Sequence, residues 1–133
     1  MATYNLKGLK KLTEQYKQQA ETIAKASLIR VGNMVISQTP KDTGRAQGNW
    51  NSAYGAPNTS TDDGRRIGGS QDELKVSVNG LEVGTEFYFT NNLPYISGLE
   101  YLGKSQQAPD GMLRVSIAKF PVIVDEEVRK VKG

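Results

Sequence analysis

The side chains that could do chemistry in this sequence are few, and the acidic ones are the first to test. Asp62-Asp63 and Asp125-Glu126-Glu127 are two carboxylate clusters that could act as acid–base pairs or metal ligands. The first lies in a glycine-rich segment. The second lies on the exposed side of an expected helix, beside Arg129 and Lys130. Catalytic carboxylate pairs need buried, unlike environments, so neither cluster predicts a hydrolase or a metal site.

Two residue types that carry much of enzyme chemistry are missing. The 133 residues contain no cysteine and no histidine, which excludes thiolate metal sites, cysteine nucleophiles and histidine-based acid–base catalysis. The glycine-rich stretch from Gly64 to Gly69 matches neither a dinucleotide fingerprint nor a phosphate-binding loop, and it precedes an expected strand. We therefore expect no catalytic residue, no cofactor and no metal, and we do not expect an enzyme.

Charge is distributed unevenly along the chain. Residues 1–40 carry six basic and two acidic side chains, whereas residues 73–103 carry one basic and four acidic ones. Such polarity can steer copies of one chain into head-to-tail contact. The lysines at 7, 10, 11 and 17 could also contact nucleic-acid phosphates without sequence preference, although a solvated helix face is the preferred interpretation. No stretch approaches 18 apolar residues and the first 12 residues are polar, so we expect a cytoplasmic protein without a membrane segment.

The elements that position these side chains begin with a long helix. Apolar residues recur at spacings of three and four from residue 6 to residue 38, and Thr39-Pro40 ends the pattern. A helix of that length measures about 50 Å, against about 30 Å for the diameter of a small domain. Part of it should therefore project from the body or pack on a neighbouring subunit.

The middle of the chain predicts strands and a loop. After a turn at residues 41–44, where Asp42 and Gly44 favour chain reversal, residues 46–54 alternate as a strand with Trp50 as a core anchor. Residues 55–72 predict a long flexible loop. Its charged pairs are candidate partner contacts, or they only keep the loop soluble: Asp62, Asp63, Arg65 and Arg66. Residues 73–78 and 83–90 predict two further strands joined by a tight turn at Asn79-Gly80.

The last third predicts helices. Pro94 can begin a short helix that ends at Gly103, and a C-terminal helix spans residues 110–131 with Asp110 as its N-cap and an interruption at Pro121. The fold class is thus α+β in one domain, 1–133, with the long N-terminal helix and the C-terminal helix packed on a three- to four-stranded antiparallel sheet. The expected core is Leu28, Val31, Val35, Trp50, Val76, Phe87, Phe89, Tyr95, Leu99, Leu113, Ile117, Phe120 and Val124.

Three segments, at residues 37–50, 91–103 and 106–113, resemble one family. They contain T-P-x-D-T-G followed by a tryptophan, then N-x-x-P-Y-x-x-x-L-E, and then Q-A-P-x-G-M before the last helix. Together they resemble the neck or tail-completion proteins of long-tailed bacteriophages, a group that includes the minor tail protein Z type. Two features depart from the pattern: the extra residue between Glu100 and Gly103, and Pro121 in the last helix. We expect Glu100 to bind nearby backbone amides or Arg45. The motif residues as a group are expected to have structural roles: Pro40, Asp42, Thr43, Gly44, Trp50, Pro94, Tyr95, Glu100, Gly103, Pro109 and Gly111.

The resemblance implies a virion structural protein without a reaction. It implies a homo-oligomeric ring, of six copies, around the DNA channel at the head–tail junction, assembled in the cytoplasm of the host bacterium. Its neighbours would be head-closure, tail-terminator or tail-tube proteins, with non-specific contact to channel DNA and no contact with a membrane. Two alternatives stay open: the tail terminator of the same particle, and a small nucleic-acid-binding protein whose affinity falls steeply with salt.

Overall fold

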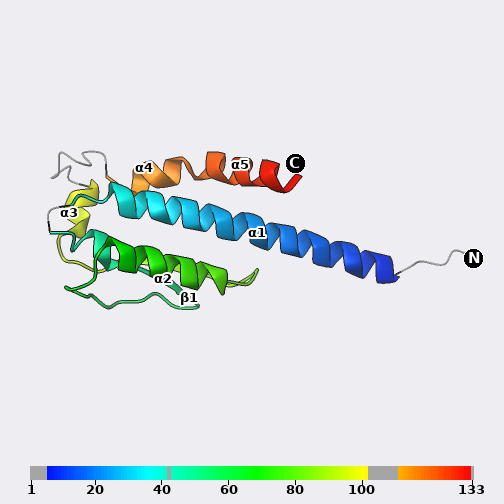
Figure 1. Cartoon of the computed structure of the whole chain (residues 1–133), viewed down its shortest axis with the longest axis horizontal. Helices are drawn as coiled ribbons and strands as arrows, with labels where there is room; N and C mark the ends of the chain where they lie inside the picture. Colours follow the sequence, from blue (N-terminus) through cyan, green and yellow to red (C-terminus); the bar gives the residue numbers. More distant parts are fainter. Residues whose placement is uncertain (1–5, 42, 102–110, 133) are drawn as a thin grey trace, which may run out of the picture.

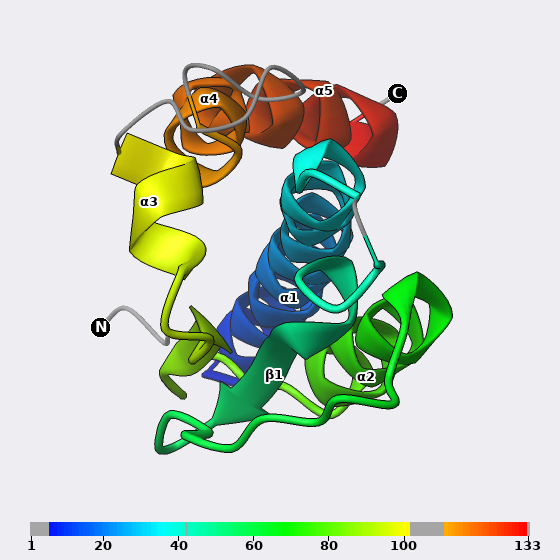
Figure 2. The ribbon, with the colours of Figure 1, turned by 90° about the vertical axis from the view of Figure 1, so that its left-hand side faces the viewer.

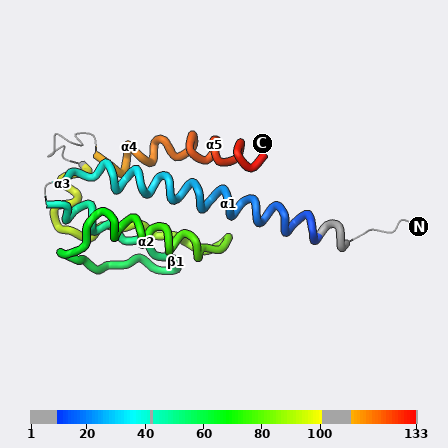
Figure 3. Tube along the Cα trace, viewed as in Figure 1, coloured from blue at the N-terminus to red at the C-terminus, as the bar shows by residue number. Residues whose placement is uncertain are grey.

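A single long helix dominates the fold. The computed structural model describes residues 6–41, 43–101 and 111–132, and its first element is α1, Leu6–Gln38. Figures 1 and 3 show that the N-terminal part of α1 extends past every other described element. Every side chain from Lys10 to Ala20 is exposed. The predicted long helix is therefore present, and part of it projects from the body.

The end of α1 is tied to the sole tryptophan. The Thr39 hydroxyl donates to the carbonyl of Val35 at 2.7 Å and accepts from Trp50 Nε1 at 2.8 Å. Pro40 follows, buried, and cannot continue the helical hydrogen bonding. Trp50 is only 4% exposed, so its prediction as a core anchor is confirmed. The indole N–H needs a partner when it is buried, and Thr39 supplies it.

The sheet is smaller than expected. A 3-10 turn, η1 (Gln47–Asn49), leads into β1 (Trp50–Tyr54), which pairs antiparallel with β2 (Phe87–Asn91) in the register Trp50 to Asn91. Within the described ranges this two-stranded ribbon is the whole sheet, so the prediction of three to four strands is wrong. The strand expected from residue 46 begins later because the Gly48 N–H bonds to the Gly44 carbonyl and coils the chain first.

One of the predicted strands is a helix in the structure. Residues predicted as the strand 73–78 lie in α2 (Ile67–Asn79), and the expected hairpin turn at Gly80 is the end of that helix. Leu74 and Val78, four residues apart, are fully buried, whereas Val76 between them is 74% exposed. In a strand all three would share one face. Gly32 of α1 permits the close packing, since a Cβ there would lie 2.5 Å from Leu74 Cδ2. The same helix removes residues 67–72 from the predicted loop.

The C-terminal part is helical and interrupted. It comprises α3 (Ile96–Tyr101), α4 (Leu113–Ala118) and α5 (Phe120–Lys132), with the break at Lys119. Pro121 is the second residue of α5, where its missing N–H costs no helical bond. The turn of Pro94 and Tyr95 precedes α3, so the short helix begins two residues later than predicted. Four predicted residues lie outside the described ranges: Asp42, Gly103, Pro109 and Asp110.

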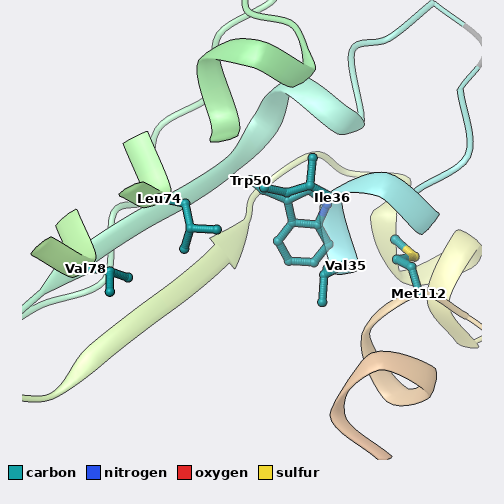
Figure 4. Close-up of a cluster of buried hydrophobic side chains, with 6 residues drawn as sticks. All are labelled: Val35, Ile36, Trp50, Leu74, Val78 and Met112. Carbon is teal, nitrogen blue, oxygen red and sulfur yellow. The ribbon is translucent and has the colours of Figure 1, made fainter. Parts of the chain in front are cut away.

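The elements are arranged in three layers around α1. Viewed end-on in Figure 2, α1 lies between α4 and α5 on one side and α2 with the ribbon on the other. Figure 4 shows the core where these layers meet: Val35, Ile36, Trp50, Leu74, Val78 and Met112. The prediction of a core position is wrong for three residues, which are 74%, 43% and 54% exposed: Val76, Tyr95 and Ile117. Their apolar character fits a buried position, but the turn before α3 and the break after α4 direct Tyr95 and Ile117 outwards.

Candidate assembly surface

The predicted loop is anchored to the first motif by an asparagine. Asn49 is 1% exposed, and its side chain forms a pair of bonds with Asp62: Oδ1 accepts from the Asp62 N–H at 2.7 Å, and Nδ2 donates to the Asp62 carbonyl at 2.9 Å. The Asp62 carboxylate in turn accepts from the N–H groups of Gly64 and Arg65. Residues 55–66 contain no helix or strand, yet they are held against η1 and β1 by these contacts.

Arg65 points into the protein. Its guanidinium donates to the carbonyls of Gly48 and Trp50, to Asn51 Oδ1 at 2.9 Å and to Glu73 Oε2 at 2.8 Å. The side chain is only 18% exposed. Glu73 completes the link, because its other oxygen accepts from the Ser52 N–H at 2.6 Å. Arg65 thus joins η1, β1 and α2, and four of its donors are used within the chain.

The other charges of the loop face outwards. Asp63 is 79% exposed and pairs with Arg45 Nε at 2.7 Å. Arg66 is exposed and donates to the Asp63 carbonyl at 2.7 Å while its side chain lies over Gly44, whose φ is +85°. Thr43 accepts from the Arg45 N–H at 3.3 Å. Of the candidate partner contacts, Asp62, Asp63 and Arg66 remain accessible, and Arg65 does not.

The second and third motifs meet at Glu100. This residue is 4% exposed and accepts from the Leu113 N–H and from Arg114 Nε at 2.9 Å. Gly111 has φ +89°, and a Cβ there would lie 1.9 Å from Glu100 Oε2, so only glycine fits. The expectation that Glu100 binds backbone amides is confirmed. Its pairing with Arg45 is wrong: the cation is Arg114, while Arg45 lies 5.8 Å from the centre of the exposed Tyr95 ring.

Ion pairs hold α5 against α1. Arg30 donates to Glu126 at 2.8 Å and to Glu127 at 3.0 Å, and Lys130 also reaches Glu127 at 3.0 Å. The hydrogen bond from Lys130, followed by that from Arg30, lowers the pKa of Glu127, and the two glutamates raise the pKa of Arg30. Part of the acidic cluster at 125–127 is therefore a structural clamp between helices.

An apolar groove runs beside α1. Its floor is α1, and β2 and α4 form its walls, with Leu28, Val35, Phe89 and Ile117 among the lining residues. This inner part has a volume of about 280 Å³ and continues into an outer part of about 360 Å³ near Ala20, Glu21, Glu82 and Val83. The two parts lie next to one another along α1 and share Leu28 and Phe87 in their linings, and we call the pair the α1 groove.

The projecting part of α1 carries a second apolar stripe. Leu12 is 43% exposed and Tyr16 is 62% exposed, four residues apart on one face. Lys10, Lys11 and Lys17 are exposed around them. Figure 3 shows that this part of α1 extends past the other described elements. Exposed apolar side chains flanked by charges are typical of surfaces that bind another protein.

We searched the described ranges for metal-binding groups, membrane-spanning helices and side chains with shifted pKa values. Within them there is no group of three acidic residues placed to bind a metal ion. None of the described helices combines the length and the apolar character that crossing a membrane requires. One tyrosine is perturbed: the hydrogen bond that Tyr88 donates to Glu86 raises its pKa. This pair is exposed at the edge of the ribbon.

Several residues that shape these surfaces were missed by the sequence reasoning. Glu73 and Arg114 look like ordinary surface charges in the sequence, and only the fold brings them to Arg65 and Glu100. A signal existed for Asn49, since a polar residue next to the buried Trp50 needs partners. The α1 groove has no sequence signal, because it depends on how three elements pack.

Comparisons of this chain with protein-family models, with curated proteins and with solved structures find no match.

Proposed function

We propose that this chain is a structural protein of the neck of a long-tailed bacteriophage. Several copies, six by the resemblance, form a ring around the DNA channel, next to head-closure, tail-terminator or tail-tube proteins. The ring is assembled in the cytoplasm of the host bacterium and stays in the virion. No reaction is involved, and the work is done by surface that neighbouring subunits bury.

One observation supports this proposal most directly: the chain exposes apolar surface both on the projecting part of α1 and beside the body of the same helix. The projecting part of α1 exposes Leu12 and Tyr16, and the α1 groove is open beside the body of the same helix. A chain with two different apolar surfaces suits assembly into a closed ring better than it suits a monomer. The assignment to a phage neck rests on the resemblance of the three motifs, in this order, to the phage neck family.

The motifs themselves support a scaffold more than a site. Glu100 and Gly111 join the second motif to the third, and Gly44 and Trp50 place the first motif against α2 and the residues before it. Residues of this kind fix the angle between layers. In a ring, that angle sets which surfaces meet between subunits.

The deciding experiment removes the gene from the genome that encodes this chain. Under the proposal, electron microscopy then shows filled heads and free tails, and supplying the wild-type gene from a plasmid restores joined virions. Joined particles in the absence of the gene refute the proposal. Tails of abnormal length, with heads intact, favour the tail-terminator alternative.

The nucleic-acid alternative rests on the exposed lysines of α1. It predicts binding of duplex DNA by the purified chain, with an affinity that falls by orders of magnitude between 50 and 200 mM salt. Replacing Lys10, Lys11 and Lys17 by glutamine removes that binding under this alternative. Under the neck proposal, deletion of the gene separates heads from tails whether or not the purified chain binds duplex DNA.

A further inference from the structure

The α1 groove and the projecting part of α1 match one another in length. The groove follows α1 from Ala20 to Val35, which is about 22 Å at the helical rise of about 1.5 Å per residue. The helix before Ala20, from Leu6, is about 21 Å long by the same rise. Both lie on the same straight helix (Figure 1), so a chain cannot place its own projecting part in its own groove. Only a second copy can do so.

The two surfaces are also complementary in charge. The projecting part carries Lys10, Lys11 and Lys17 against Glu14, a charge of +2 over residues 10–20. The outer end of the groove carries Glu21 and Glu82, with Glu86 exposed close by. Lys25 lines the same end and donates to the Asn79 carbonyl at 3.1 Å, which leaves its positive charge in place, so the charged residues of this lining sum to −1. Opposite charges at the rim of an interface fix its register and speed encounter.

The apolar parts match as well. The inner groove is lined by Leu28, Phe89 and Ile117, and Ile117 is 54% exposed there. Val83, on the wall of the outer part, is 55% exposed. If a helix placed Leu12 and Tyr16 in the groove, one contact would cover these two side chains together with Ile117 and Val83. This is the helix-in-groove mode of recognition, which uses anchors three or four residues apart.

We propose that the projecting part of α1 of one copy docks in the α1 groove of the next copy. Leu12 and Tyr16 are the anchors, and Lys10, Lys11 and Lys17 face the glutamates at the outer end. This inference deepens the proposed function and rests on it, because it names the contact between ring subunits. Such a contact uses different surfaces on the two partners, so it is heterologous and repeats around a ring until it closes.

The test is a mixing experiment with two blocked variants of the full chain. One variant, Leu12→Glu with Tyr16→Glu, loses the anchors and keeps the groove. The other, Val83→Lys with Ile117→Lys, loses the groove and keeps the anchors. All four positions are exposed, so both variants should fold, which circular dichroism and thermal melting check. A matched control, Val76→Lys with Val122→Lys, adds the same charges at exposed sites that do not line the groove.

Sedimentation at concentrations up to about 1 mM gives the result. The proposal expects assembly of the wild type and of the control, monomers for each blocked variant alone, and a one-to-one heterodimer when the two blocked variants are mixed. The heterodimer forms because the intact helix of one copy meets the intact groove of the other. Replacing Lys17 by glutamine in the groove-blocked variant should weaken the heterodimer about two- to five-fold, the scale of an exposed ion pair.

Three outcomes overturn the inference. A groove-blocked variant that assembles like the wild type means that projecting helices pair with each other. A mixture without heterodimer means that the helix and the groove do not meet. A wild-type chain that stays monomeric at about 1 mM means that the contact is too weak to hold a ring.

Together with the gene-deletion experiment, the mixing experiment distinguishes a failure of this contact from a failure of the proposed function. If the blocked variants form the heterodimer but deletion leaves virions joined, the neck function fails and the contact stands. If deletion separates heads from tails but the mixture contains no heterodimer, the function stands and the ring uses another contact.

Discussion

Replacing Arg65 by alanine removes the side chain that links η1, β1 and α2. The change deletes donors to two backbone carbonyls, to Asn51 and to the carboxylate of Glu73. Glu73 then keeps only the Ser52 N–H as a partner in this network and loses its cation. Arg66, the neighbour in sequence, is exposed and bonds only to backbone carbonyls of the same loop. The two arginines therefore form a matched pair for comparison.

The expected cost follows from the number of bonds and from their burial. Hydrogen bonds to a charged group contribute about 1.5–3 kcal/mol each, but bonds of one side chain are not additive and water can replace part of them. With the side chain 18% exposed and Glu73 30% exposed, we expect a loss of about 3 kcal/mol in the free energy of unfolding. For a chain of this length that corresponds to a fall of about 10 °C in Tm. Arg66→Ala should cost about 0.5 kcal/mol or less.

The fluorescence of Trp50 during urea unfolding measures this difference. It is the sole tryptophan, and its own carbonyl accepts one of the Arg65 bonds. Arg65→Lys is a useful third variant, because it keeps the charge and loses the planar fork, so its midpoint should lie between those of the wild type and Arg65→Ala. Equal midpoints for Arg65→Ala and Arg66→Ala would refute the reasoning. Arg65 would then again be a candidate for contact with a partner protein.

Three further changes probe other parts of the chain. Glu100→Ala removes the carboxylate that accepts from the Leu113 N–H and from Arg114 Nε and should cost about 2 kcal/mol in chemical unfolding, whereas Glu100→Gln keeps an oxygen for the amide and should cost less. Leu74→Ala opens a cavity at a fully buried position and should cost about 3 kcal/mol by the same assay; a cost below about 1 kcal/mol would contradict the packing of α2 on α1. The lowered pKa of Glu127 means that its ionised form stabilises the folded state above its ordinary pKa, and that this contribution is lost as the pH falls through the lowered value. Glu127→Gln should therefore flatten the acid limb of a stability curve below the ordinary pKa of glutamate and leave the limb above pH 7 unchanged in shape.

The sequence predicted the elements whose signals are long or strongly punctuated. The apolar period of α1 and the stop at Thr39-Pro40 fix a helix that appears with the predicted bounds. The split of the C-terminal helix near Pro121 also follows from the missing N–H of proline. In both cases local chemistry and tertiary packing favour the same structure.

The failure at α2 has a physical cause. Leu74, Val76 and Val78 fit a strand by alternation, and Leu74 with Val78 fits a helix by its period of about four. Gly68 and Gly69 near the start of α2 weaken the helical signal further. The helix packs closely on α1 at Gly32, whose missing side chain leaves room for Leu74. That contact joins residues more than 40 positions apart, so no local pattern contains it.

The candidate surfaces could be predicted only in part. The length of α1 predicted its projection, which is present, whereas the head-to-tail contact suggested by the net charges of the segments stays a prediction. The inward direction of Arg65 could not be predicted, because Asp62, Asp63, Arg65 and Arg66 are equivalent until Asn49 and Glu73 are placed. The groove likewise follows from the positions of β2 and α4 beside α1, which the sequence does not specify.

The two environments of α1 give one continuous helix two levels of local stability. From Ser27 onwards it has buried positions in each turn, so its backbone bonds open only when the body unfolds. Between Lys10 and Ala20 every side chain is exposed, and those turns depend on helix propagation alone, which is marginal at that length. Amide hydrogens should therefore exchange along α1 in a gradient that steepens near Glu21. A protease that cuts after lysine should therefore cleave at Lys17 before it cleaves the body, and the docking proposed above would protect this end from cleavage.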